Sequence, residues 1–182
     1  IFEMQDIVCS GLEFASLQAL DTSSMTVTNC TFSVLRMPGL QLAPPSVSIS
    51  KNPFLKAVEF PLAQGIQPIT ISISGNPLLQ RVDFSALKFA GGLTISNNSV
   101  LDSLQLGQLL NASSGFTIEG TSVLALVLPS VSKIGALLVE NNRFLTKVEF
   151  PVLNTITGMQ SGIGIVGNPL LDTIAFPVLG RI

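Results

Sequence analysis

The chain has 182 residues, of which 47% are hydrophobic and only 11% are charged, and its formal net charge is −2. No apolar run reaches the roughly 18 residues that a membrane-spanning helix requires, so we expect no membrane span in this segment. The weak negative charge argues against binding to nucleic acid. The absence of histidine removes the commonest general base and metal ligand. We therefore expect no enzyme, no metal site and no cofactor.

One motif recurs along the chain. It opens on a polar or small residue followed by asparagine, and it continues through a leucine into a short alternating apolar pair. Four copies are KNPFLKAVEFP at 51–61, GNPLLQRVDFS at 75–85, NNRFLTKVEFP at 141–151 and GNPLLDTIAFP at 167–177. Self-similarity at a fixed period indicates a repeat architecture.

The asparagine of the motif marks a reference position in each repeat. Successive reference positions lie 21 to 26 residues apart, which predicts eight solenoid turns of about 23 residues. In chain order they are Asp6, Asn29, Asn52, Asn76, Asn98, Thr121, Asn142 and Asn168.

Apolar residues recur at fixed offsets from the reference position. Apolar and polar residues alternate before it, as in 47–50 and 71–74, which predicts a strand with one face inward. The same alternation at 58–60 predicts a second short strand. A third inward element lies near 131–134 and 153–156. We therefore predict an all-β parallel β-solenoid that forms one domain over 1–182. One inward column, three residues past the reference position, is Cys9, Phe32, Leu55, Leu79, Leu101, Leu124, Leu145 and Leu171.

Asparagines at the corners can bond the local backbone and the equivalent side chain one turn away. We expect them to form a structural ladder. Because the chain starts and stops inside a turn, we also expect further repeats or self-association at the coil ends. The predicted ladder residues are Asn29, Asn52, Asn76, Asn98, Asn142 and Asn168.

Two cysteines, Cys9 and Cys30, lie 21 residues apart, close to one repeat. Stacked turns would bring them near each other, which predicts a disulfide and an oxidising compartment. The alternative is a pair of buried thiols that pack as small apolar side chains.

Three sequons allow N-glycosylation, at Asn29, Asn97 and Asn111. We expect Asn111 to be the best acceptor because the segment 109–115 looks like a loop. Asn97 lies at a corner. Asn29 is expected to be held in the ladder.

Two outward faces have functional alternatives. Glu59 and Asp83 lie in one outward column and could form an acid pair for polysaccharide cleavage, or they could pair with Arg36 and Arg81 on a solvated face. Columns of serine and threonine before the reference position could order ice, or could simply keep the sheet soluble.

The pattern N-P-x-L-x-x-V-x-F-P-x-L-x-x-I-x-G resembles the receptor L-domain superfamily. It looks most like the fungal-type, GPI-anchored cell-wall proteins related to the yeast extracellular-matrix protein Ecm-thirty-three. The residues that carry it are 142–158 and 168–182. The resemblance implies a secreted or wall-linked, leucine-rich-like β-coil.

We therefore expect a non-enzymatic, extracellular structural or adhesive protein of a cell surface, cell wall or surface filament such as a flagellar hair. Its partners would be proteins or glycans of the cell surface. The alternative is a glycan- or protein-binding receptor-type L-domain module. Ice binding and polysaccharide cleavage are minor alternatives.

Overall fold

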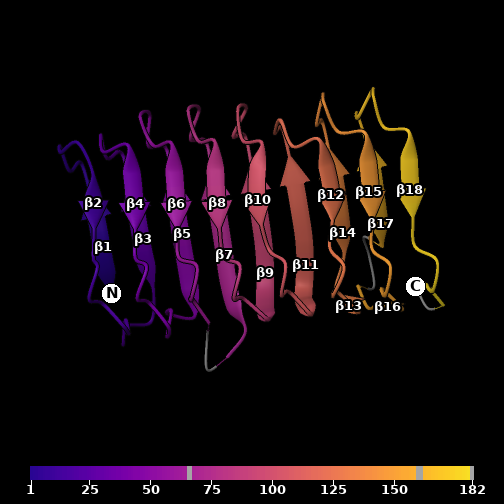
Figure 1. Ribbon diagram of the computed structural model, residues 1–182, viewed down its shortest axis with the longest axis horizontal. Coiled ribbons are helices and arrows are strands. Elements are labelled where there is room, and N and C mark those ends of the chain that lie inside the picture. Colours follow the sequence, from indigo (N-terminus) through magenta and orange to yellow (C-terminus); the bar gives the residue numbers. More distant parts are fainter. Residues whose placement is uncertain (65–66, 159–161, 181–182) are drawn as a thin grey trace.

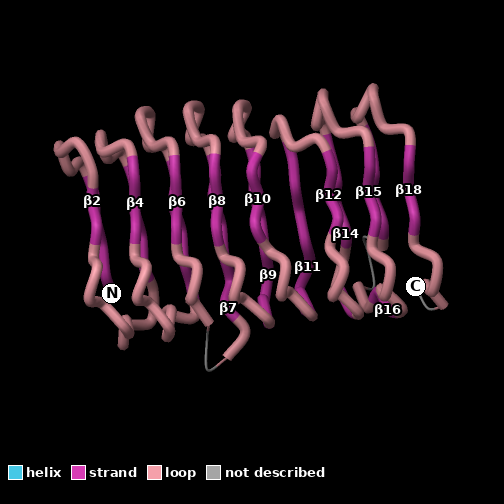
Figure 2. Tube along the Cα trace, in the orientation of Figure 1, coloured by secondary structure: helices cyan, strands magenta, loops and turns pink. Residues whose placement is uncertain are grey.

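The chain winds into an all-β parallel solenoid with about 23 residues per turn, as the sequence predicts. It has about seven turns rather than the eight that the sequence predicts. The computed structural model describes residues 1–64, 67–158 and 162–180. Figure 1 shows the turns side by side from the N-terminal to the C-terminal end, and Figure 2 shows that strands and loops make up the described chain.

Within the described residues, three parallel sheets form the walls of the coil. The largest runs along one side, and the other two follow one another on the opposite side. The largest sheet contains β1 (Phe2–Gln5), β3 (Met25–Thr28), β5 (Ser46–Ser50), β7 (Ile69–Ser74), β9 (Phe89–Ser96), β11 (Asn111–Glu119), β13 (Lys133–Ile134), β14 (Leu137–Glu140), β16 (Thr155–Ile156) and β17 (Ile163–Val166). The second contains β2 (Leu12–Glu13), β4 (Val34–Arg36), β6 (Ala57–Glu59), β8 (Arg81–Asp83) and β10 (Ser103–Gln105), and the third β12 (Ala125–Val127), β15 (Lys147–Glu149) and β18 (Thr173–Ala175).

Pairing in register stacks like residues on like. Ile49 pairs with Ile73, which pairs with Ile95, and Val58 pairs with Val82. All of these side chains are buried in the space between the sheets. The Phe60 and Phe84 rings meet edge to face with centroids 5.3 Å apart. Because each buried aliphatic or aromatic side chain contributes about 1.5–3 kcal/mol, the stacked columns supply the main stabilisation of the coil.

One member of the inward column was assigned wrongly from the sequence. Leu124 is 62% exposed, and Val123 is buried in its place. The corner after Thr121 is one residue shorter than the corner after Asn98, so counting three residues forward overshoots the core.

The sequence suggested that the segment 109–115 is a loop. In the structure most of it is strand, because β11 begins at Asn111. Its pairing with β9 shifts register between Ala112 and Gly115, so the extra residues form an irregularity within a strand. The sequence also suggests a loop bulge at 157–162, but residues 159–161 of it lie outside the described residues.

Glycine at position 135 is required by the close approach of neighbouring turns. A Cβ there would lie 2.5 Å from the backbone carbonyl carbon and oxygen of Ser114. Overpacking against backbone of this kind costs about 1–3 kcal/mol or more.

We expect Gly135→Ala to lower the free energy of unfolding by about 3 kcal/mol, measured by urea denaturation. Gly107→Ala is the control, because no atom lies within 4 Å of a Cβ at that position, and a similar loss in both variants would contradict the packing account.

Candidate functional site

A ladder of buried asparagines runs along the corner that joins the largest sheet to the opposite wall. Asn52, Asn76, Asn98 and Asn142 are fully buried. The Asn76 Oδ1 atom accepts the backbone N–H of Asn52 at 3.0 Å, and the Asn98 Oδ1 atom accepts that of Asn76 at 3.1 Å. The same bond joins Asn142 N–H to Asn168 Oδ1 at 2.9 Å. Each carboxamide therefore binds the backbone of the turn before it.

The amide nitrogen of the ladder carboxamides donates hydrogen bonds to backbone carbonyls at the corner. Asn98 Nδ2 donates to Ile73 O in the preceding turn at 2.9 Å and to Ser96 O in its own turn at 3.0 Å. Asn168 Nδ2 donates in the same way to Val139 O and Val166 O. Because buried carbonyls need partners, each side chain ties its own corner to the turn before it.

Asn29 does not belong to this ladder, contrary to the sequence prediction. The register pairs Thr28 with Ser50, so Asn29 aligns with Lys51 and Cys30 aligns with Asn52. The Cys30 N–H donates to Asn52 Oδ1 at 2.9 Å, and its Sγ lies 3.6 Å from Met4 O and 3.3 Å from Thr28 O. The Cys30 thiol thus takes the place of an asparagine carboxamide in the ladder. Asn29 lies one residue earlier at the corner and is exposed, with φ 53°.

The predicted disulfide is also absent, because both cysteines are free thiols. Pairing on either side of the corner, Met4 with Val27 and Leu12 with Leu35, has an offset of 23 residues. The partner of Cys9 in the next turn is therefore Phe32, two residues beyond Cys30. Cys30 is buried in the ladder position and Cys9 is partly exposed.

Thr121 interrupts the ladder. Its N–H and its Oγ1 both donate to Asn142 Oδ1, at 3.0 and 2.7 Å. Within residues 1–64, 67–158 and 162–180, no side-chain oxygen at position 121 accepts the N–H of Asn98. The second and third sheets also separate at this point, between β10 and β12.

The three sequons lie in different settings. Asn29 and Asn97 occupy equivalent exposed corner positions, both with φ 53°. Asn111 instead lies in β11, between Phe89 of β9 and Lys133 of β13. Its Oδ1 is buried without a hydrogen-bond partner. Of the three, Asn29 and Asn97 therefore present an exposed corner side chain.

Glu59 and Asp83 are both held in ion pairs on the outer face of the second sheet. Glu59 Oε2 lies 2.6 Å from Arg36 Nε, and Asp83 Oδ2 lies 2.9 Å from Arg81 Nη2. Asp83 Oδ1 also accepts from the N–H and hydroxyl of Ser85. The hydrogen bond and the charge of Glu59 raise the pKa of the Arg36 guanidinium. The two carboxylates are thus ion-paired, as one of the two alternatives expected, although Asp83 is buried and not solvated.

Hydroxyl groups line the outer face of the largest sheet. One column pairs Thr26, Ser48, Ser72, Thr94 and Thr117 across five strands. A second column, two residues away, consists of Thr28, Ser50, Ser74 and Ser96. Towards the C-terminal end the columns continue as Leu138 and Glu140, so the hydroxyl face covers the middle of the coil.

A row of exposed apolar side chains, which we call the crest, lies at the corner outside the asparagine ladder. The loops of this corner form the upper edge of Figure 1. Its side chains are exposed by 37–55%, although all are large and hydrophobic. Sequence analysis missed this column, although the motif shows it as the apolar residue before each inward leucine. The row is interrupted in the Thr121 turn, where Ser122 precedes the inward Val123 and Leu124 aligns with Thr146 instead. The crest residues are Phe54, Leu78, Val100, Phe144 and Leu170.

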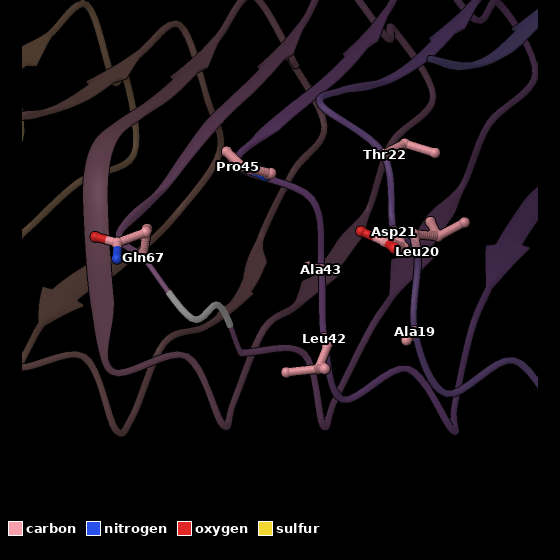
Figure 3. Close-up of a pocket in the computed structure, with 8 residues that line it drawn as sticks. All are labelled: Ala19, Leu20, Asp21, Thr22, Leu42, Ala43, Pro45 and Gln67. Carbon is pink, nitrogen blue, oxygen red and sulfur yellow. The ribbon is translucent and has the colours of Figure 1, made fainter.

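A hollow of about 580 Å³ lies near the N-terminal end of the coil, away from the crest. Leu20, Leu42 and Pro45 line it, and Figure 3 shows Asp21 and Gln67 on opposite sides of it. Residues 65–66, next to Gln67, lie outside the described part of the chain, and no ligand is assigned to this hollow.

Among the described residues, no helix is long and apolar enough to cross a membrane, and no three acidic, cysteine or histidine side chains gather as a metal site. No family model, curated protein or solved structure matches the chain. The resemblance to the receptor L-domain superfamily therefore stays a prediction.

Replacing Thr121 by asparagine should complete the ladder. The new Oδ1 would accept the N–H of Asn98, and the new Nδ2 would replace the threonine hydroxyl as donor to Asn142. A satisfied buried hydrogen bond contributes about 0.5–1.5 kcal/mol, so we expect Thr121→Asn to raise the free energy of unfolding by about 1 kcal/mol. Thr146→Asn, at an exposed corner residue, is the control and should change stability by less than about 0.5 kcal/mol. A destabilised Thr121→Asn variant would show that the interruption is not a defect in hydrogen bonding.

Proposed function

We propose that the chain is a non-enzymatic structural or adhesive repeat protein of a cell surface, cell wall or surface filament. The observation that carries this proposal is the repetition of outward side chains from turn to turn. The crest takes one residue from each of five turns, and the hydroxyl columns extend over four and five strands. Extended, periodic surfaces of this kind suit contact with another extended surface or filament.

Two further observations support this proposal. Asn29 and Asn97 stand at exposed corners, where an N-glycan would not disturb the core. The carboxylates weighed for catalysis, Glu59 and Asp83, are held in ion pairs with arginines. The resemblance of the repeat motif to cell-wall L-domain proteins favours the same assignment.

A surface location can be tested directly. Antibodies raised against the purified chain should label intact, unpermeabilised cells of the source. Antibody that has been absorbed with the purified chain, and antibody against a cytosolic protein, are the controls. Labelling that appears only after permeabilisation would refute the proposal.

The second candidate is a glycan-binding module, and the hydroxyl face is the observation that favours it. A flat array of hydroxyls can exchange hydrogen bonds with sugar hydroxyls.

We expect a glycan array to give at least one hit with the purified chain. The change Ser72→Lys should then reduce binding at least tenfold, because it places a long cation in the middle of the array. Gln105→Lys, exposed on the opposite wall, should leave binding unchanged. An array without hits would remove this candidate.

A further inference from the structure

A row of outward side chains crosses the first residues of strands β9, β11, β13 and β16 in the largest sheet. Its members pair with one another across the strands. The next residue along each of these strands is buried, so strand alternation points the row outward. Its first member carries an aromatic ring that is 50% exposed. The row, which we call the Phe89 row, consists of Phe89, Asn111, Lys133 and Thr155.

Beside Phe89 the outer face lacks side chains, because β9 continues through Gly91 and Gly92. A Cβ at position 91 would lie 2.9 Å from Thr70 Oγ1, so the neighbouring strand requires glycine there. A Cβ at position 92 would lie 3.8 Å from Ser114 and 3.9 Å from Thr70, which is ordinary contact. Gly92 also has no positive φ. Neither packing nor backbone conformation therefore requires glycine at position 92.

The groups around this glycine pair suit a saccharide. The face of an aromatic ring packs against the C–H groups of a sugar, and the hydroxyls of Thr70 and Ser114 can each donate and accept hydrogen bonds. Bare glycine backbone lets a ligand approach the sheet closely. A single exposed phenylalanine is ordinary on a protein surface, but here the ring adjoins open backbone that hydroxyls flank.

The row also has the length of a short sugar chain. Phe89 and Lys133 are two strand spacings apart, which is roughly 10 Å and matches a disaccharide that lies across the strands. Asn111 stands between them, and within the described residues its Oδ1 atom accepts no hydrogen bond. The fold therefore does not use this oxygen as an acceptor.

The charge beside the row favours an acidic saccharide. Lys133 and Lys88, the residue before Phe89, are both exposed. Neither forms an ion pair in the part of the chain that the structure describes. The stretches 84–92, 106–118 and 128–139 contain these two lysines and no acidic residue. This part of the surface is therefore positive, although the net charge of the chain is −2.

We propose that the Phe89 row and the adjoining glycine pair bind an acidic saccharide. One sugar ring packs against Phe89 above Gly92, and the carboxylate or sulfate of the next ring lies against Lys133. This inference rests on the glycan-binding candidate given above, and it names the class of ligand and the part of the sheet that holds it.

NMR titration of the purified full chain tests the proposal. The probes are a tetragalacturonate, whose acids are carboxylates, and a chondroitin sulfate tetrasaccharide, which also carries sulfate. We expect at least one of them to bind with a dissociation constant of about 1 mM or tighter and to shift the amide signals of Phe89, Gly92 and Lys133. The methyl ester of the galacturonate keeps the sugar rings and loses the charge, so it should bind at least tenfold more weakly than the free acid.

Three substitutions separate the parts of the site. Phe89→Ala removes the ring, Gly92→Leu covers the open backbone, and Lys133→Gln removes the charge, so each should weaken binding of the acidic saccharide at least tenfold. Gly92→Leu keeps the test independent of folding, because the fold does not require glycine there. The matched controls are Phe54→Ala and Lys56→Gln at the opposite corner, where Phe54 is 53% exposed and Lys56 is exposed. They should leave binding unchanged, and all five variants should keep the thermal midpoint of the unchanged chain.

Several results would overturn the proposal. They are the absence of binding by both probes, equal binding of a bound galacturonate and its methyl ester, and binding that any one of the three site substitutions fails to weaken beyond the controls. Co-sedimentation with phosphatidylserine vesicles that Phe89→Ala abolishes, without saccharide binding, would assign the row to a lipid headgroup instead.

Failure of this inference is distinguishable from failure of the proposed function. A glycan-array hit with a neutral sugar that is insensitive to Phe89→Ala would refute the acidic-saccharide site and leave the glycan-binding candidate standing. A chain that binds no saccharide but is labelled on intact cells would refute both, and it would leave the proposed surface role standing.

Discussion

The buried carboxamide at each corner is the interaction on which the rest of the structure depends. A slip by one residue would turn the apolar face of a strand outward, so strand alternation already opposes it. A slip by two residues keeps that face inward, and the non-directional hydrophobic effect opposes it only weakly. The ladder removes this remaining freedom, since Asn76 binds Asn52 N–H in one turn and donates to carbonyls in two turns. A slip would leave several buried polar groups without partners, and each would cost about 1–3 kcal/mol. The ladder therefore sets the register that aligns the outer columns.

Much of the fold follows from the period of the sequence. Residues of equal chemistry recur every 23 or so positions, so the inward columns through Leu55 and Phe60 and the ladder positions from Asn52 onward could be predicted from the sequence alone. Errors arose where a corner changed its length or its usual side chains. Asn29 looked like a reference position because it is an asparagine, yet it is the corner residue with positive φ, and the ladder position after it is Cys30. The same kind of offset explains Leu124 and the mistaken pairing of Cys9 with Cys30.

The crest was harder to predict for a different reason. Strand alternation shows which side chains of a strand point inward, but it does not apply at a corner, where the chain reverses direction. Phe54, Leu78 and Phe144 are as apolar as the core residues that follow them, and composition alone would place them inside. Only the geometry of the corner shows that they stand outside the ladder, in line and exposed. The ladder inside and the crest outside thus share one period, and both are interrupted at the turn of Thr121.

Amide hydrogen exchange measured residue by residue tests the central role of the ladder most directly. The N–H groups of Asn52, Asn76 and Asn142, which donate to the carboxamides of the ladder, should exchange only through global unfolding. Their protection should equal that of the core strands, while Asn98 N–H, next to the interruption at Thr121, should exchange faster. If the three ladder amides exchanged as fast as exposed corner amides, the carboxamides would not be holding the turns in register and this account would be wrong.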